Sequence, residues 1–168
     1  ETIDSRIWPR TAAIAERLWS PQDIRNIDDM YSRLEITSIH LEELGLQHLR
    51  NQEMMIRRIA PGRDISSLKL LVSLIEPLKE YKRHAQGVPY STDLTFTRIP
   101  DIAFPESDQA RKFKMLCDKF VKGRDTSVTS ELKSMLIKWR NNHDHVVAVV
   151  TGIPALVDWI KASATLKE

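Results

Sequence analysis

The side chains whose types best suit metal chemistry are two histidines that flank an acid, His143-Asp144-His145. Imidazole and carboxylate groups both bind zinc, and a site needs three or four such ligands. On a helix, however, side chains at positions i and i+2 point about 200° apart, so His143 and His145 cannot share one ion. No cysteine and histidine stand at ligand spacing elsewhere in the chain. We therefore predict no metal site and interpret the triplet as part of an ordinary helix.

Two pairs of adjacent carboxylates, Asp28-Asp29 and Glu42-Glu43, are candidates for acid and base chemistry. Catalytic carboxylates are brought together across space, whereas the side chains of neighbours on a helix diverge. The helix dipole favours acids in a first helical turn, which accounts for the aspartates. A solvated helix face accounts for the glutamates. Neither pair is predicted to be catalytic.

The single cysteine, Cys117, lies in an apolar run with Phe113, Leu116 and Phe120, which favours a small core residue over a nucleophile. It has no second cysteine with which to form an internal disulfide. The sequence contains no phosphate-binding loop, G-x-S-x-G, H-E-x-x-H or dinucleotide motif, and nothing orders its serines, histidines and aspartates into a triad. The prediction is therefore no catalytic, substrate-binding or metal-binding residue, and no cofactor.

The net charge of +2 gives no electrostatic reason to expect nucleic acid as a partner. Basic residues gather in two runs that are mixed with acids and lack interleaved exposed aromatics, which favours surface solubility over phosphate binding. The runs consist of Arg50, Arg57, Arg58 and Arg63, and of Arg111, Lys112, Lys114, Lys119, Lys122 and Arg124. No stretch approaches the roughly eighteen apolar residues of a membrane span, so none is predicted.

The elements that must position these groups are helices, because apolar residues recur at spacings of three and four. Asn26 and Gly45 have the residue types that cap the two ends of a helix, and Pro77 should kink or split another helix. The weak alternation of Leu94-Thr95-Phe96-Thr97 has no second strand to pair with, so residues 87–105 are predicted to be a crossing loop. Helices are predicted over about 9–19, 26–44, 53–59, 64–85, 106–121 and 128–150, and again after a turn at 152–154.

The resulting fold class is all-α, a helical bundle. Each predicted helix has an apolar face that should point inward. These faces contain Ile27, Met30, Tyr31, Leu34, Leu41 and Leu44; Leu68, Leu71, Val72, Ile75, Leu78 and Tyr81; Phe113, Leu116, Cys117 and Phe120; Val128, Leu132, Met135, Leu136, Trp139, His143, Val146 and Val150; and Leu156, Val157 and Ile160.

The opening segment from Asp4 to Ser20 is the densest in large side chains. Pro9 suits a first helical turn, since its missing N–H costs nothing there. From Pro9 to Trp19 apolar side chains spread over most of the circumference, so this helix is expected to be buried on more than one side. The next residues, 20–23, have a capping sequence and predict a short second helical turn.

This segment resembles the end of the catalytic domain of the β-N-acetylhexosaminidases, glycoside hydrolase family 20. The resemblance is carried by Asp4-Ser5-Arg6-Ile7-Trp8-Pro9-Arg10, by Ala12 to Ser20 with its A-E-R-L-W motif, and by Pro21, Asp28, Tyr31, Arg33 and Leu34, roughly a fifth of the 168 residues. The remainder, with Glu76-Pro77 and Tyr81, more weakly resembles the extra helical region of some bacterial members.

The resemblance implies a (β/α)8 barrel whose last helix runs from about Trp8 to Trp19. It also implies hydrolysis of terminal β-linked N-acetylhexosamine with retention, assisted by the substrate's own acetamido group. The family's G-G-D-E-like motif, which carries the aspartate and glutamate of that reaction, does not occur here. Its final W-x-E motif should lie just before Glu1. Trp8 and Trp19 belong to the helix side and are expected to pack rather than to stack on substrate.

We therefore expect residues 1–25 to be the end of the barrel domain and residues 26–168 to be a carboxyl-terminal helical region. The partner is the missing amino-terminal barrel of the same protein, and a homo-oligomer is an alternative partner because the first helix exposes apolar surface without its barrel. The fragment itself is predicted to be structural and inactive, and its parent to be periplasmic or secreted by resemblance. Two other classes remain open: an autonomous helical interaction module, and a carbohydrate-binding module, which would need exposed aromatics beside a groove.

Overall fold

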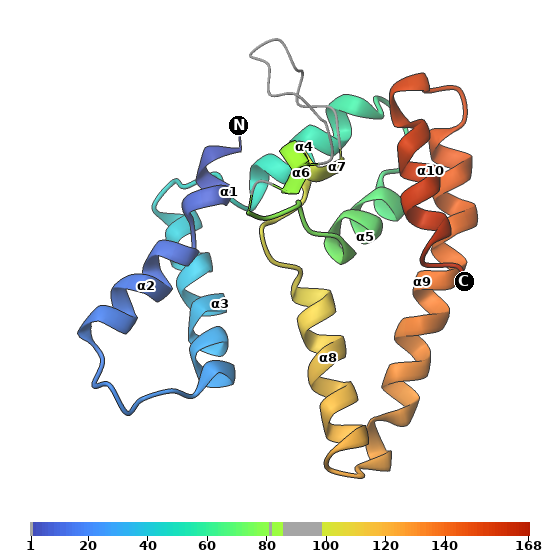
Figure 1. Cartoon of the computed structure of the whole chain (residues 1–168). Coiled ribbons are helices and arrows are strands. Elements are labelled where there is room, and N and C mark those ends of the chain that lie inside the picture. The colour runs from blue at the N-terminus through green and yellow to red at the C-terminus, as the bar shows by residue number, and fades with distance from the viewer. Residues whose placement is uncertain (1, 81, 86–98) are drawn as a thin grey trace. The chain divides into compact units, whose positions relative to one another are not determined.

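The computed structural model describes residues 2–80, 82–85 and 99–168, and every regular element in these ranges is a helix (Figure 1). The all-α prediction is confirmed. The chain divides into two compact units, Glu1–Met54 (unit 1) and Met55–Glu168 (unit 2), and the division falls within α4. The helices are α1 (Ile3–Ile7), α2 (Arg10–Trp19), α3 (Ile27–Glu43), α4 (Arg50–Ile59), α5 (Ser66–Leu74), α6 (Lys82–Ala85), α7 (Ile99–Ile102), α8 (Asp108–Val121), η1 (Thr126–Val128), α9 (Thr129–Val150), η2 (Pro154–Leu156) and α10 (Val157–Ala164).

Unit 1 begins with the short helix α1, which the sequence pattern did not predict. A cis peptide bond between Trp8 and Pro9 separates α1 from α2. Pro9 is the N-cap residue of α2 rather than part of its first turn. The predicted helical turn after Ser20 is wrong, because residues 20–26 form a non-helical connection to α3.

The expectation that α2 is buried on more than one side is not met within this chain. Ile14, Leu18 and Trp19 are 61%, 80% and 90% exposed. The physical reason is that α3 packs along α2 and covers one face, while the rest of the apolar circumference has no cover from the described residues of unit 1.

Helix α3 begins and ends where the sequence predicted. The Asn26 side chain accepts a hydrogen bond from the Asp29 amide at 3.1 Å, which caps the first turn. Gly45 follows the helix with a φ of +96°, a conformation that costs little only for glycine. The predicted inward face is wrong for Ile27 and Leu44, which are exposed, since they lie at the two ends of the helix.

Unit 2 contains the apolar core. Helix α5 packs against α8 and α9, and α10 folds back along α9, as Figure 1 shows. The predicted core positions of α5 are buried, and Trp159 of α10 is a core residue that the pattern missed. The buried apolar side chains are Met55, Ile56, Ala60, Leu68, Leu71, Val72, Ile99, Ile102, Ala103, Trp139, Val146, Val150, Leu156 and Trp159.

Several boundaries in unit 2 differ from expectation. The segment predicted over 64–85 is split, as Pro77 required, but α5 already ends at Leu74. The short helix α7 was not predicted, and residues 94–97 lie outside the described residues. The predicted inward orientation is wrong for Leu78, Phe120, Leu136 and Val157, which are all exposed. Leu78 lies beyond the end of α5, where the helical spacing no longer holds. Tyr81, predicted to lie on the same face as Leu78, is outside the described residues. Among the described residues, no helix is both long and apolar enough to cross a bilayer.

Candidate functional site

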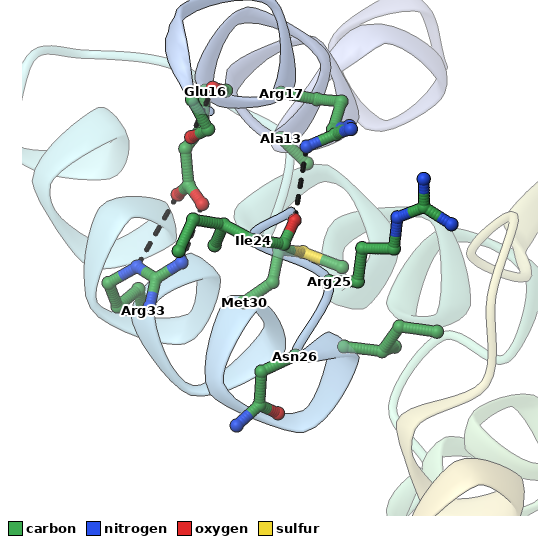
Figure 2. Close-up of a pocket in the computed structure, with 10 residues that line it drawn as sticks. Ala13, Glu16, Arg17, Ile24, Arg25, Asn26, Met30 and Arg33 are labelled. Atoms are coloured by element: carbon green, nitrogen blue, oxygen red, sulfur yellow. Dashed lines mark hydrogen bonds and ion pairs between the residues drawn. The ribbon is translucent and has the colours of Figure 1, made fainter. Parts of the chain in front are cut away.

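A groove lies between α2 and α3 in unit 1, in the segment that carries the family resemblance. Its volume is about 400 Å³, and Figure 2 shows the residues that line it. Its lining is largely apolar and includes Ala13 from α2, Ile24 from the connection and Met30 from α3. The other lining residues are Glu16, Arg17, Ser20, Arg25, Asn26, Ile27 and Arg33.

Arg17 shapes one end of the groove. Its Nη1 donates to the carbonyl oxygens of Pro21 and Ile24 at 3.1 and 3.0 Å, and its Nη2 donates to that of Gln22 at 3.2 Å. These bonds turn the carbonyls of the connection toward α2, which explains why the connection is not helical. The guanidinium is therefore engaged in holding the backbone.

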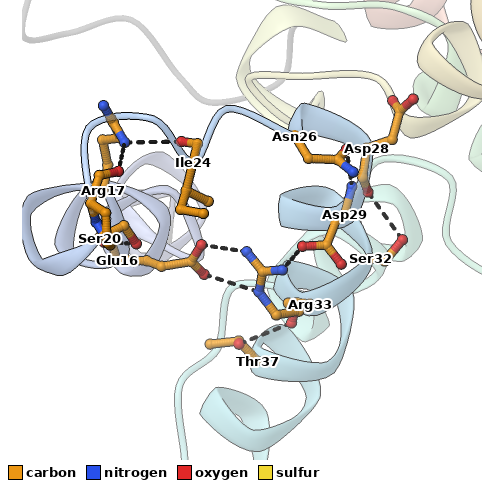
Figure 3. A network of polar contacts seen from close by, with 11 residues as sticks. Glu16, Arg17, Ser20, Ile24, Asn26, Asp28, Asp29, Ser32, Arg33 and Thr37 are labelled. Carbon is orange, nitrogen blue, oxygen red and sulfur yellow. Dashed lines mark hydrogen bonds and ion pairs between the residues drawn. The ribbon is translucent and has the colours of Figure 1, made fainter.

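Arg33 of α3 pairs with Glu16 of α2 and with Asp29 of its own helix (Figure 3). Its Nη2 lies 2.5 Å from Oε1 of Glu16, and its Nη1 is paired with Asp29 one helical turn earlier. A glycosidic acid must hold a proton within reach of a leaving oxygen. Glu16 instead accepts charge-assisted hydrogen bonds from Arg33, so both of its carboxylate oxygens are engaged in an ion pair. The network is suited to fastening two helices rather than to proton transfer.

The three residues of the triplet, His143, Asp144 and His145, each make different contacts. Nδ1 of His143 lies 2.8 Å from Oγ of Ser163, while Lys167 holds the pKa of Asp144 below its usual value through a 2.9 Å bond. The Ser163 hydroxyl donates to the carbonyl oxygen of Ile160 at 3.0 Å, so it accepts from His143. A serine whose proton is held by a backbone carbonyl is not activated by that histidine. The pair is a helix contact.

His145 lines a second, more polar hollow of about 610 Å³ beside α5 and α9 in unit 2. Asp64, at its edge, accepts from the amide and the hydroxyl of Ser66 at 2.9 and 2.7 Å, and these bonds lower its pKa. Asp64 thus forms a local turn with Ser66 just before α5, whose N-cap residue is Ile65. Within the described ranges, no group of three histidine, cysteine or acidic side chains could hold a metal ion.

The other candidate residues lie on the surface or contact the ends of helices. Cys117 is half-buried on α8. In the second basic run, Lys114 and Lys122 both lie 2.8 Å from Asp118 and lower its pKa to about 2. In the first run, Arg63 donates to the carbonyl oxygens of Val149 and Thr151 at the end of α9, at 2.5 and 2.8 Å. No residue is brought into a catalytic arrangement by these contacts.

Sequence reasoning missed one buried polar pair. His48, between α3 and α4, is buried, and its Nε2 lies 2.7 Å from Oγ of Ser38 on α3. A lone histidine in a connection gives no periodic signal, so the sequence pattern could not single it out.

Comparisons with known proteins place the chain in a family. No protein-family model matches the chain. The β-hexosaminidase subunit beta of Sus scrofa is 49% identical over 44 residues, and that of Homo sapiens is 46% identical over 44 residues. A probable β-hexosaminidase of Drosophila melanogaster, fdl, is 44% identical over 50 residues. These matches cover 26%, 26% and 27% of this chain and 8% of each relative, so the chain spans a small part of the relatives' length.

The solved structure of a chitobiase from Flavobacterium johnsoniae is similar over a far longer stretch. It has a TM-score of 0.90 and 33% sequence identity, and the match covers 99% of this chain and 25% of that one. The likeness therefore extends through both units, beyond the segment that the curated relatives share. Together, these similarities to β-hexosaminidases and to a chitobiase mean that the chain belongs to the β-N-acetylhexosaminidases of glycoside hydrolase family 20, as a carboxyl-terminal part of such an enzyme.

Proposed function

We propose that this chain supports the catalytic barrel of a β-N-acetylhexosaminidase and does not itself carry out hydrolysis. The parent enzyme would release terminal β-linked N-acetylhexosamine with retention, the substrate's acetamido oxygen attacking the anomeric carbon. That reaction needs an aspartate that orients the acetamido group and a glutamate that protonates the leaving oxygen. The chain lacks the family motif for that pair, and Glu16, the one acid in the α2–α3 groove, is paired with Arg33.

The observation that carries the structural role is the apolar surface of α2. Ile14, Leu18 and Trp19 are all exposed in this chain, although they lie in the segment that resembles the last helix of the barrel. Burying a large apolar side chain contributes about 1.5–3 kcal/mol. A barrel that covers these three residues would therefore gain several such contributions. Residues 1–25 are accordingly proposed as the end of the barrel domain and residues 26–168 as the appended helical region.

An assay of the pure chain with a chromogenic N-acetylglucosaminide tests the inactive role. We expect no turnover above that of buffer, since no residue is placed to protonate the leaving oxygen. A Glu16→Gln variant is the matched control for contamination, because it removes the one acid of the groove. Turnover in the unmodified chain that is lost in Glu16→Gln would overturn the proposal.

The same apolar surface makes self-association the alternative when no barrel is present. Light scattering of the chain over a range of concentrations should show a mass that rises above that of the monomer. Replacing Leu18 and Trp19 together with serine should return the chain to a monomer. A chain that is already monomeric at every concentration would count against a homo-oligomer formed through α2.

A second candidate function is an autonomous helical interaction module. It is favoured by the core of unit 2, where the buried side chains of α5, α9 and α10 pack within the unit itself. Residues 60–168 expressed alone should then give a monomer that unfolds in one cooperative transition. Aggregation of that piece would argue against autonomy and leave the supporting role.

A further inference from the structure

The connection between α3 and α4 in unit 1 contains a titratable side chain that the proposed function does not use. His48 is 1% exposed, and Ser38, which contacts its Nε2 at 2.7 Å, is also buried. Nδ1 of His48 is enclosed and has no hydrogen-bond partner in the described part of the chain. A buried polar atom without a partner is costly and uncommon.

Polar contacts of this kind matter more in unit 1 than elsewhere. Ser38 and His48 are the buried side chains among residues 2–54, and no large apolar side chain is buried there. The neighbouring Gln47 amide donates to Oδ2 of Asp4 on α1 at 2.9 Å. His48 therefore attaches the connection to α3, and Gln47 attaches it to α1.

Protonation of His48 conflicts with this arrangement. A neutral imidazole has one donor and one acceptor, so one nitrogen can bond to Ser38 and the other is left with the cost of an unpaired neutral group. In the imidazolium both nitrogens donate, and Nδ1–H becomes a buried charged donor without an acceptor.

The charged groups near His48 do not remove this conflict. Burial holds the pKa of His48 below its ordinary value. It outweighs Glu42 of α3, Asp4 of α1 and a hydrogen bond with the Ser38 backbone, which all favour the cation. Within the connection itself, residues 44–49 carry no other charge. His40 at the end of α3 and Arg50 at the start of α4 are both exposed.

We propose that His48 and Ser38 form an acid-sensitive latch in which neutral His48 holds residues 44–49 on α3 and protonated His48 releases them. The direction of the pH dependence follows from how tightly His48 binds a proton in the closed and open states of the latch. When the closed state binds the proton less tightly than the open state, the latch is fully effective above the ordinary histidine pKa of about 6.5. It is then progressively lost as the pH falls through that value.

Amide hydrogen exchange of the full chain tests the latch at about pH 8 and about pH 5, either side of the ordinary histidine range. Protection factors, which are already corrected for the intrinsic effect of pH, should fall for residues 44–49 at the lower pH. The expected fall is about tenfold for each unit that separates the closed-state pKa from the open-state value. His48→Gln, whose neutral amide can still bond to Ser38, should abolish the difference between the two pH values. The exposed histidine supplies the matched control, His40→Gln, which should keep the difference.

An unchanged pH dependence in His48→Gln would overturn the latch. If that variant does not fold, nuclear magnetic resonance of the unmodified chain tests the latch instead. The ring protons of His48 should titrate with a midpoint below about 6.5, and the amides of residues 44–49 should change with that midpoint. A midpoint at or above the ordinary value would contradict the proposal.

Discussion

Unit 1 and unit 2 are built from similar helices but bury very different side chains. All the buried apolar residues of the described chain lie in unit 2, from Met55 onward. In contrast, eleven of the seventeen exposed large hydrophobic residues in the described ranges lie in unit 1, and six lie in unit 2. Unit 2 therefore closes a core of its own, whereas unit 1 is held by polar contacts and presents apolar surface outward. Helix content alone does not show which part of a chain buries its own apolar side chains.

The largest expected effect compares two tryptophans. Trp159 in unit 2 is 1% exposed and Trp19 in unit 1 is 90% exposed. Trp159→Ala should lower the free energy of unfolding by about 3–5 kcal/mol, because it leaves a cavity in the core. Trp19→Ala should change it by less than about 0.5 kcal/mol. Chemical denaturation followed by circular dichroism measures both, and equal losses would break the comparison.

A smaller effect is expected at the end of α9. Arg63→Ala removes the two hydrogen bonds to the Val149 and Thr151 carbonyls and a cation from a helix carboxyl end. Unit 2 should lose about 1–2 kcal/mol in the free energy of unfolding.

Arg140→Ala, at an exposed site inside the same helix, is the control for Arg63→Ala and should change stability by less than about 0.5 kcal/mol. The same denaturation experiment compares the two variants. If Arg140→Ala costs as much as Arg63→Ala, the loss is a general effect of removing an exposed arginine and not of the two bonds to the end of α9.

In unit 1, the link between α2 and α3 should be weaker. Arg33→Ala removes the ion pairs with Glu16 and Asp29, whose side chains are substantially exposed. Because such pairs are screened by solvent, the cost should be about 0–1 kcal/mol and should shrink at high salt. Amide exchange in α2 at low and high salt measures it. A larger, salt-independent loss would mean that Arg33 supports more than these two pairs.

The smallest effect concerns pH at the surface of unit 2. Lys114 and Lys122 lower the pKa of Asp118 to about 2. A carboxyl group whose pKa is lower in the folded state than in the unfolded state stabilises the fold at pH values above its unfolded-state pKa. This stabilisation is lost as the pH falls toward the folded-state pKa, so it stays constant near neutral pH. Carbon-detected magnetic resonance should place the Asp118 midpoint near 2. Replacing both lysines with methionine should raise it toward its usual range, and an unchanged midpoint would exclude the lysines as the cause.

Local signals predicted much of the fold. Asn26 and Gly45 set the two ends of α3, and the spacing of Leu68, Leu71 and Val72 identified the buried face of α5. These features depend on neighbours in the sequence, so the chain itself carries the information. The family resemblance of the opening segment likewise rested on residues that stand together.

The rest depends on contacts between distant residues. The exposure of Ile14 and Leu18 could not be read from their spacing, because periodicity shows an apolar face but not whether this chain supplies its cover. The bonds from Arg63 to α9 join residues far apart in sequence, and the contact of His48 with Ser38 joins a connection to the preceding helix, so neither follows from periodicity. The candidate groove depends instead on local bonds from Arg17 to backbone carbonyls of the α2–α3 connection, which carry no sequence signature.

The most direct test of the difference between the two units is amide hydrogen exchange of the full chain at a concentration where light scattering shows a monomer. Exchange rates report the free energy of local opening. We predict slow exchange in α5, α9 and α10 of unit 2 and fast exchange in α2 of unit 1. Protection of α2 in the monomer equal to that of α9 would contradict it.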